Sequence, residues 1–197
     1  MDRYARAAQA IEEFLRALGY ESKGELVGTG ERVAQAWLDE LVSGEGKDAR
    51  APLRDGSLSL GDGPHGPVLL RNVAVATMCP HHLLPSHGHA TVAYRPRRLA
   101  AGLGAIAQMI DLSARRLALQ ETLTQSIANA LHEGLDAEGS FCHLAMTHTC
   151  FVVRGERQDA SVVESMAFAG SFAADERPLA LALFGGAPAA PTGSGTP

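Results

Sequence analysis

The segment from Cys79 to His82 holds one thiol and two imidazoles within four residues, and a second His and Cys, His148 and Cys150, lie far downstream. Thiolate and imidazole are the usual protein ligands of zinc, and a catalytic zinc site takes three of them and leaves one position for water. A Cys and a His three residues apart, together with one distant Cys, make such a set. Pro80 breaks any strand at this point, so Cys79 and His82 can face one ion. The alternative is a buried Cys beside surface histidines.

The composition favours a globular protein that binds neither nucleic acid nor membranes. Of the 197 residues, 46% are hydrophobic and 20% are charged, which is ordinary for a globular domain with a real core. No apolar run approaches the roughly 20 residues of a membrane span, and no signal peptide is recognisable, so we expect a cytoplasmic protein. A net charge of −5 argues against nonspecific nucleic-acid binding. Three cysteines, an odd number, favour thiol or metal chemistry over a disulfide framework.

The first part of the chain reads as a helical arm over residues 1–45. Apolar residues recur at helical spacing over 3–18, where Gly19 closes the helix, and Thr29 resembles the N-cap of a second helix. Residues 46–66 are rich in Gly, Pro, Asp and Ser and are expected to form a connecting loop. A core is expected over 67–185, followed by a disordered tail over 186–197.

The core pattern is two strands, two helices and two strands, which predicts an α+β fold with an antiparallel sheet. The expected strands cover 68–78, 90–94, 140–154 and 159–172, the helices cover 103–115 and 119–133, and a short helix follows near 176–184. Alternation along the third strand would put His148, Cys150 and Arg154 on one face. Cys142 has the same parity but is expected to be a small core residue.

Several motifs, in order, resemble the GTP cyclohydrolase I family over about residues 29–172. They are Glu31-Arg32-Val33-Ala34 with Trp37, Cys79-Pro80-His81-His82-Leu83-Leu84-Pro85 with Gly88 and Val92-Ala93-Tyr94-Arg95-Pro96, Ala114-Arg115-Arg116-Leu117 through Gln120-Glu121-Thr122-Leu123-Thr124, and Thr147-His148-Thr149-Cys150 with Arg154-Gly155. The resemblance implies the tunnelling fold, an antiparallel sheet with two helices on one face. It also implies homo-oligomeric rings, usually decamers, with sites between subunits, and a purine as the small-molecule partner.

The resemblance also implies a role for each site residue. Cys79, His82 and Cys150 would bind Zn²⁺, which lowers the pKa of bound water to about 7 for attack on C8 of a guanine ring. His148 and His81 would be proton donors, although His81 can also be read as a solvent-facing neighbour of a ligand. Glu121, assisted by Gln120, would accept hydrogen bonds from the guanine edge. The alternative for this pair is the first turn of a helix, where a carboxylate is favoured anyway.

The departures from the family pattern gather on the phosphate side. The family usually has Ser, Lys and Arg where this chain has Gly104, Ala105 and Gln108, and a Lys where it has Gln35. Only Arg32 and Arg154 remain as phosphate-binding candidates. Pro80 and Ser86 replace the Glu and Phe that the family prefers. The sequence therefore leaves three readings open: a cyclohydrolase for a guanine compound with fewer phosphates than GTP, an ordinary GTP cyclohydrolase I that makes 7,8-dihydroneopterin triphosphate, or a non-catalytic purine- or pterin-binding paralogue.

Overall fold

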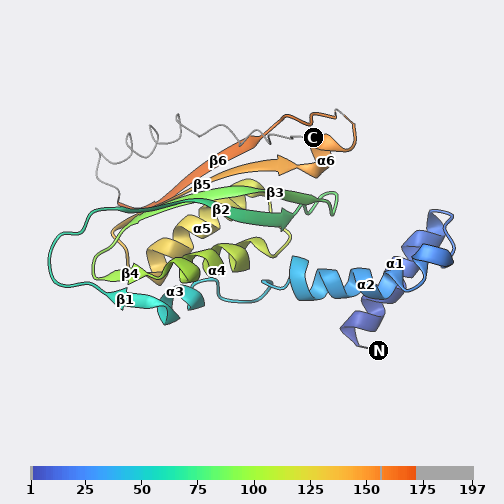
Figure 1. Ribbon diagram of the computed structural model, residues 1–197, viewed down its shortest axis with the longest axis horizontal. Coiled ribbons are helices and arrows are strands. Elements are labelled where there is room, and N and C mark those ends of the chain that lie inside the picture. The colour runs from blue at the N-terminus through green and yellow to red at the C-terminus, as the bar shows by residue number, and fades with distance from the viewer. Residues whose placement is uncertain (1, 156, 172–197) are drawn as a thin grey trace, which may run out of the picture.

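The core is a four-stranded antiparallel sheet with two helices on one face. The computed structural model describes residues 2–155 and 157–171. The strands are β2 (Val68–Met78), β3 (Pro85–Arg95), β5 (Gly139–His148) and β6 (Val163–Gly170), in the order β2-β3-β5-β6. The helices α4 (Leu103–Ala114) and α5 (Gln120–Gly134) cover the same face of this sheet (Figure 1). The predicted antiparallel α+β fold is confirmed.

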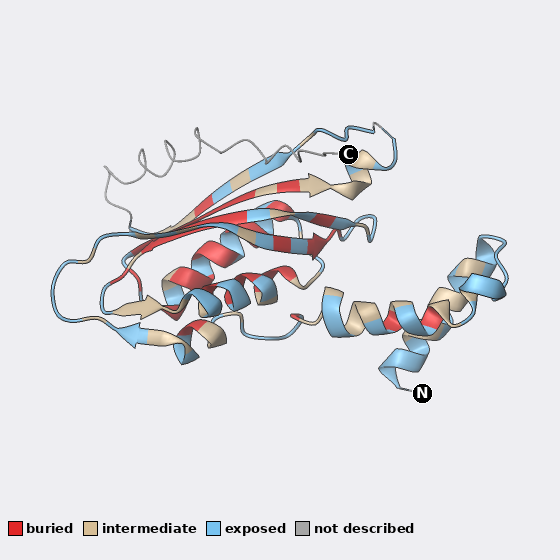
Figure 2. Ribbon diagram, viewed as in Figure 1, coloured by how far each residue is buried: buried red, intermediate tan, exposed pale blue. Residues whose placement is uncertain are grey.

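The main hydrophobic core lies between the sheet and the two helices. The inner residues of the strands, among them Val92 and Leu144, pack with Ile110 and Ile127 of the helices, and Figure 2 shows this layer as the buried part of the molecule. Cys142 belongs to the same cluster, as predicted, and burial raises the pKa of its thiol. A buried apolar layer of this kind is the main source of stability in a domain of this size.

One glycine marks the closest approach of two central strands. Gly88 of β3 pairs with Met146 of β5, and a Cβ at this glycine would lie 2.0 Å from the carbonyl oxygen of Ala145. No side chain fits at that distance, so the β3–β5 register needs glycine here.

The N-terminal arm is a helical hairpin that projects from the core (Figure 1). Helix α1 (Arg3–Ala17) packs against α2 (Thr29–Ala36), which continues as the π-helical turn η2 (Trp37–Leu41), and the short 3₁₀ helix η1 (Gly24–Leu26) lies in the connection. The Gly30 amide donates to Glu12 across the pair at 2.8 Å. No residue of α1 is buried, and the arm is largely exposed (Figure 2). Its apolar side chains are therefore available to another surface.

Two arginines after α4 join the arm to the core through backbone groups. Arg115 donates to the carbonyl of Glu40 at 2.8 Å, and its own carbonyl accepts from the Gly44 amide at 2.9 Å. Arg116 donates to the carbonyls of Gly44 and Leu112 at 3.1 and 2.9 Å. Both guanidinium groups are thus engaged in holding this junction.

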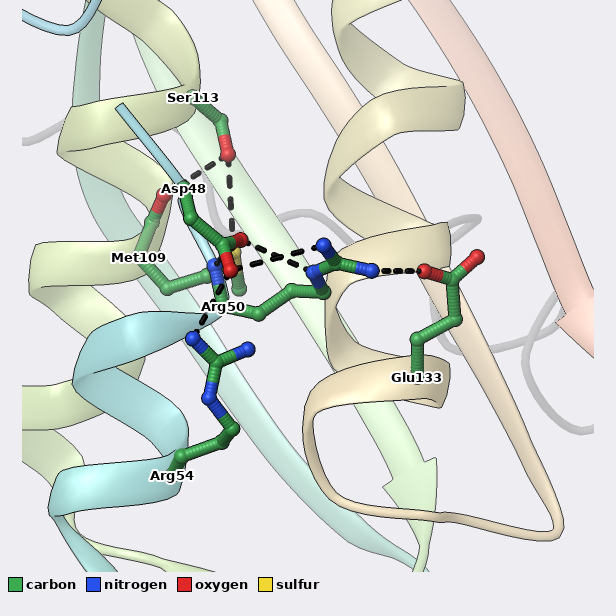
Figure 3. A network of polar contacts seen from close by, with 6 residues as sticks. All are labelled: Asp48, Arg50, Arg54, Met109, Ser113 and Glu133. Carbon is green, nitrogen blue, oxygen red and sulfur yellow. Dashed lines mark hydrogen bonds and ion pairs between the residues drawn. The ribbon is translucent and has the colours of Figure 1, made fainter. Parts of the chain in front are cut away.

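The connection over 46–66 has more structure than its composition indicated. It contains α3 (Ala51–Asp55) and β1 (Ser57–Ser59), and β1 pairs with β4 (Leu99–Ala101). Arg50 donates to Asp48 at 2.9 Å and to Glu133 of α5 at 2.8 Å, and Arg54 also donates to Asp48 (Figure 3). Hydrogen bonds from Arg50, then from Arg54, hold the pKa of the Asp48 carboxyl well below its usual range. The segment is therefore tied to the end of α5 by charge.

The predicted third strand is wrong beyond His148. Its partner strand β3 begins only at Pro85, so the pair Ser86–His148 is the last one between β3 and β5. From Thr149 the chain turns into the short helix α6 (Thr149–Val152), and the apolar, β-branched sequence there gave no sign of the turn. Cys150 and Arg154 therefore do not continue a strand face. The expected helix near 176–184 and the tail over 186–197 lie outside the described residues. Among the residues that are described, no helix is long and apolar enough to cross a membrane.

Candidate metal centre and adjoining pocket

The loop between β2 and β3 places two potential metal ligands side by side. The Cys79 amide donates to the Leu84 carbonyl at 2.9 Å, and the Leu83 amide donates to the Cys79 carbonyl at 2.9 Å. Leu83 takes a left-handed conformation, with φ at 54°, to close this loop. The Sγ atom of Cys79 then lies 3.7 Å from Nδ1 of His82.

The turn α6 brings in the third ligand. The Thr149 hydroxyl donates to the Pro85 carbonyl at 2.6 Å, which fixes α6 against the start of β3. The ligand atoms of Cys79, His82 and Cys150 all lie within 4.8 Å of one another. With Zn–S near 2.3 Å and Zn–N near 2.0 Å, a tetrahedral ion separates neighbouring S and N ligands by about 3.6 Å. The predicted ligand set therefore fits a tetrahedral cation.

The electrostatics of the two thiols also suit a cation. Burial, and then the proximity of Cys79, raise the pKa of the Cys150 thiol, while the charge of Arg154 lowers it. Two thiolates close together repel each other, and a divalent ion between them removes that repulsion.

An open pocket of about 290 Å³ adjoins the three ligands and holds the other predicted site residues of the core except Arg154. Its walls come from the metal loop, the N-terminus of α5, and the segment that leads into α6. The lining residues are Cys79, Pro80, His81, His82, Ser86, Ala118, Leu119, Gln120, Glu121, His148, Cys150, Phe151 and Val163.

The side chain of Gln120 is a buried junction rather than an open surface group. It is 2% exposed, and its Nε2 donates to the carbonyls of Leu144 and Val163 at 3.2 and 2.9 Å and to Ser165 Oγ at 3.0 Å. Its Oε1 lies 2.7 Å from Nε2 of His148. Both ends of the amide are thus engaged inside the subunit, and assistance in base recognition stays a prediction.

The remaining titratable groups of the pocket are His148, Glu121 and His81. Burial lowers the pKa of His148, and the charge of Glu121 partly opposes this effect. Glu121 is exposed in the first turn of α5, where the helix dipole favours a carboxylate. His81 is exposed beside His82, with the two rings edge to face. Imidazole and carboxylate groups that line one pocket can exchange protons with a bound molecule.

Within one subunit, Arg32, Arg154 and Gly104 are not among the described residues that line this pocket. Arg32 donates within the arm to the Val27 carbonyl at 2.9 Å and to Thr29 at 3.0 Å. Arg154 is exposed beyond α6. Gly104 is the second residue of α4, and this helix starts near β4, at the end of the sheet opposite the metal loop (Figure 1).

Several exposed apolar side chains line the pocket or lie close in sequence to residues that do. Leu119, Phe151 and Val163 line it, and Leu83, Leu117, Val153 and Val162 belong to the neighbouring segments. Exposed apolar side chains gathered in this way are typical of a surface that meets another protein surface.

Sequence reasoning missed two hydroxyl groups at the site. Ser86 Oγ lies 3.0 Å from Nδ1 of His148, although its position was noted only as a departure from the family. Thr149 anchors α6, and nothing in its spacing separated it from an ordinary strand residue.

Comparison with known proteins identifies close relatives. A family model described as GTP cyclohydrolase I matches residues 7–183. The chain is 39% identical over 170 residues to GTP cyclohydrolase 1 of Leifsonia xyli subsp. xyli, covering 86% of this chain and 88% of that protein. It is 34% identical over 181 residues to GTP cyclohydrolase 1 of Rhodopirellula baltica, covering 91% and 77%. The structure of the archaeosine synthase QueF-Like in the apo form aligns with a TM-score of 0.45 at 15% identity, over 56% of this chain and 100% of that one.

The Gln120 junction predicts a large loss of stability on truncation. Gln120→Ala removes the hydrogen bonds of a buried amide to Leu144, Val163, Ser165 and His148, and each bond contributes about 0.5–1.5 kcal/mol. Gln125→Ala is the matched control: its amide is exposed and donates to Asn129 and, at 3.3 Å, to the Phe168 carbonyl, so its loss is expected to cost under about 1 kcal/mol. Urea unfolding of the two variants measures the difference. Equal stabilities would show that the amide does not hold α5 to β5 and β6.

Proposed function

The chain belongs to the GTP cyclohydrolase I family, and on this premise we propose that it is a zinc-dependent enzyme that opens the imidazole ring of a guanine-type purine at C8. The observation that carries the proposal is the meeting of three metal ligands, two further imidazoles and a free carboxylate at one pocket. A purine-binding protein without catalysis would not need those imidazoles.

Zinc would be held by Cys79, His82 and Cys150, with the fourth position left open to the pocket. A bound zinc ion of this kind supplies Lewis acidity and an activated water molecule. A structural zinc site usually has four protein ligands, and the described residues around this one supply three. The ligand set therefore favours a catalytic metal.

The imidazoles supply the proton transfers. His148 would protonate the purine nitrogen as the ring opens, because it lines the same pocket as the metal ligands and the nearby charge of Glu121 favours its protonated form. His81, exposed at the mouth of the pocket, would donate at the base or the ribose.

Base selection would come from the start of α5. The Glu121 carboxylate complements the two donors of the guanine edge, N1–H and the exocyclic amine, and adenine does not present that pair. Because Gln120 is fully engaged with His148 and the sheet, its contribution to recognition would act through the position of Glu121 next to it.

The phosphate side supports a substrate with fewer phosphates than GTP. Gly104, Ala105, Gln108 and Gln35 carry no charge, and Arg115 and Arg116 are engaged in the junction with the arm. Three missing cations, at about 1.5–3 kcal/mol per charged hydrogen bond, weaken triphosphate binding by several kcal/mol. Arg32 and Arg154 would remain for a monophosphate. The alternative is an ordinary GTP cyclohydrolase I that makes 7,8-dihydroneopterin triphosphate.

A homo-oligomer, a decamer in the family pattern, would complete each pocket. Leu119, Phe151 and Val163 are exposed in the pocket lining, and Arg32 and Gly104 do not line the pocket of their own subunit. Light scattering should therefore give a mass several times that of the 20.7 kDa chain. A monomer with full activity would contradict this assembly.

Removal of one thiol tests the metal site. Cys150→Ala should lose most of the bound zinc and all ring-opening activity, since two ligands hold the ion poorly. Cys142→Ala is the matched control. Because Cys142 is buried in the core, this variant should keep one zinc per subunit. Metal analysis of the purified proteins measures both. Full zinc in Cys150→Ala would remove this residue from the ligand set.

A substrate series tests the reaction. We expect zinc-loaded protein to release formate from guanine, guanosine or guanosine monophosphate with a higher kcat/KM than from GTP at fixed ionic strength. Mass spectrometry of the products shows whether the reaction stops after ring opening. Clear preference for GTP, with dihydroneopterin triphosphate as product, would overturn the phosphate argument. No formate from any of the four compounds would favour the non-catalytic reading.

A further inference from the structure

We propose that Thr149 is a positioning residue for the metal ligand Cys150, and that its hydroxyl places this thiol before an ion binds. The Thr149 hydroxyl donates to the Pro85 carbonyl at 2.6 Å, and Cys150 is the next residue of the chain. The inference rests on the metal ligands of the proposed function and not on the proposed reaction. It predicts that one hydroxyl group sets how tightly the ion is held.

The pairing of β3 with β5 explains why a side chain is needed at this point. Ser86 and His148 form the last pair, and the same register would place Thr149 opposite Pro85. Proline has no backbone N–H, so Pro85 can offer only its carbonyl to the neighbouring strand. The Thr149 hydroxyl bonds that carbonyl, and α6 therefore stays attached to β3 one residue beyond the last pair.

Consecutive carbonyls of one short segment hold the two thiol ligands. The Cys79 amide donates to the Leu84 carbonyl at 2.9 Å, and Thr149 bonds the carbonyl of the next residue, Pro85. The start of β3 therefore sets the separation of Cys79 and Cys150 without any contribution from an ion. A site whose ligands are in place beforehand loses less conformational entropy when the ion enters, and this raises its affinity.

The turn α6 has few other attachments. None of its residues, Thr149–Val152, is buried, so apolar packing does not fix the turn. The thiols of Cys150 and Cys79 are in hydrogen-bond contact, but thiols are weak donors and acceptors, and a bound ion would replace this contact. The Thr149 hydroxyl is therefore the principal noncovalent attachment of the turn among the described residues.

The competing role for Thr149 is a general contribution to stability, because its bond joins two segments of the fold. A structural role lowers the stability of the metal-free protein, and it affects zinc binding only through the fraction that is folded. A positioning role lowers the affinity for zinc while the metal-free protein keeps its stability. The two roles therefore separate in measurements on the same variants.

The first experiment measures zinc affinity by titration of full-length protein against a chromogenic chelator of known affinity. It compares wild type with Thr149→Val, which keeps the shape of the side chain and loses the hydroxyl, and with Thr149→Ser, which keeps the hydroxyl. Ser126→Ala is the matched control. The exposed hydroxyl of Ser126 donates to the Thr122 carbonyl at 2.8 Å within α5, and Ser126 is not among the described residues that line the pocket.

We expect Thr149→Val to bind zinc about three- to tenfold more weakly than wild type, as for the loss of one neutral hydrogen bond. Thr149→Ser should restore most of the affinity, and Ser126→Ala should stay within about twofold of wild type. The urea midpoints of metal-free Thr149→Val and Ser126→Ala should agree. Wild-type affinity in Thr149→Val, no recovery in Thr149→Ser, or a lower urea midpoint for Thr149→Val would overturn the proposal. A wild type that binds no zinc would overturn both this proposal and the zinc dependence of the proposed function.

The second experiment needs neither metal nor substrate. The Val153 amide donates to the Thr149 carbonyl at 2.9 Å at the end of α6, so its hydrogen exchange reports how often the turn opens. In metal-free protein we expect this amide to exchange severalfold faster in Thr149→Val than in wild type, Thr149→Ser and Ser126→Ala. Equal exchange in all of these proteins would show that the hydroxyl does not hold α6. That result would refute the positioning role even where the ring-opening reaction is confirmed.

Discussion

The amide of Gln120 is the contact on which the organisation of the site depends. It is the first residue of α5, and it joins that helix to β5 through Leu144 and to β6 through Val163 and Ser165. The same side chain bonds the imidazole of His148 at the end of β5. The position of Glu121 at the mouth of the pocket follows from that attachment, since it is the next residue of the helix. Buried polar networks of this kind fix one arrangement because every alternative leaves a group unpaired.

The candidate metal centre depends on a different constraint, the point at which the β3–β5 ladder ends. Since β3 begins at Pro85, β5 has no partner beyond His148, and the chain turns into α6. The Thr149 hydroxyl then ties that turn to the Pro85 carbonyl. Cys79 and Cys150, far apart in sequence, meet because both leave the same end of the sheet. The site is therefore a product of two strand ends rather than of a strand face.

The sequence was informative where the chemistry is local and less so where it depends on tertiary partners. The ligand types and the Cys79 to His82 spacing predicted a metal site. Apolar periodicity predicted the two helices and the order of strands and helices along the chain. The end of β5 was missed because the residues after His148 favour a strand and only the lack of a partner stops them. The contacts of Ser86 and Gln120 could not be predicted either, because each bonds groups at least 24 residues away. Residues that meet across such separations leave no periodic signal in one sequence.

Ser86 and Gly88 lie two residues apart on the same face of β3, and they differ in how freely each can be replaced. The Ala145 carbonyl leaves no room for a side chain at Gly88, so this position accepts only glycine. Ser86 instead meets the imidazole of His148, a side chain that can turn without a shift of the strand register. Because Gly88 fixes the strand register, a substitution at Ser86 changes the surroundings of the His148 imidazole and leaves the pairing of β3 with β5 in place. A single substitution at Ser86 can therefore alter the chemistry of His148 during evolution without a change in the fold.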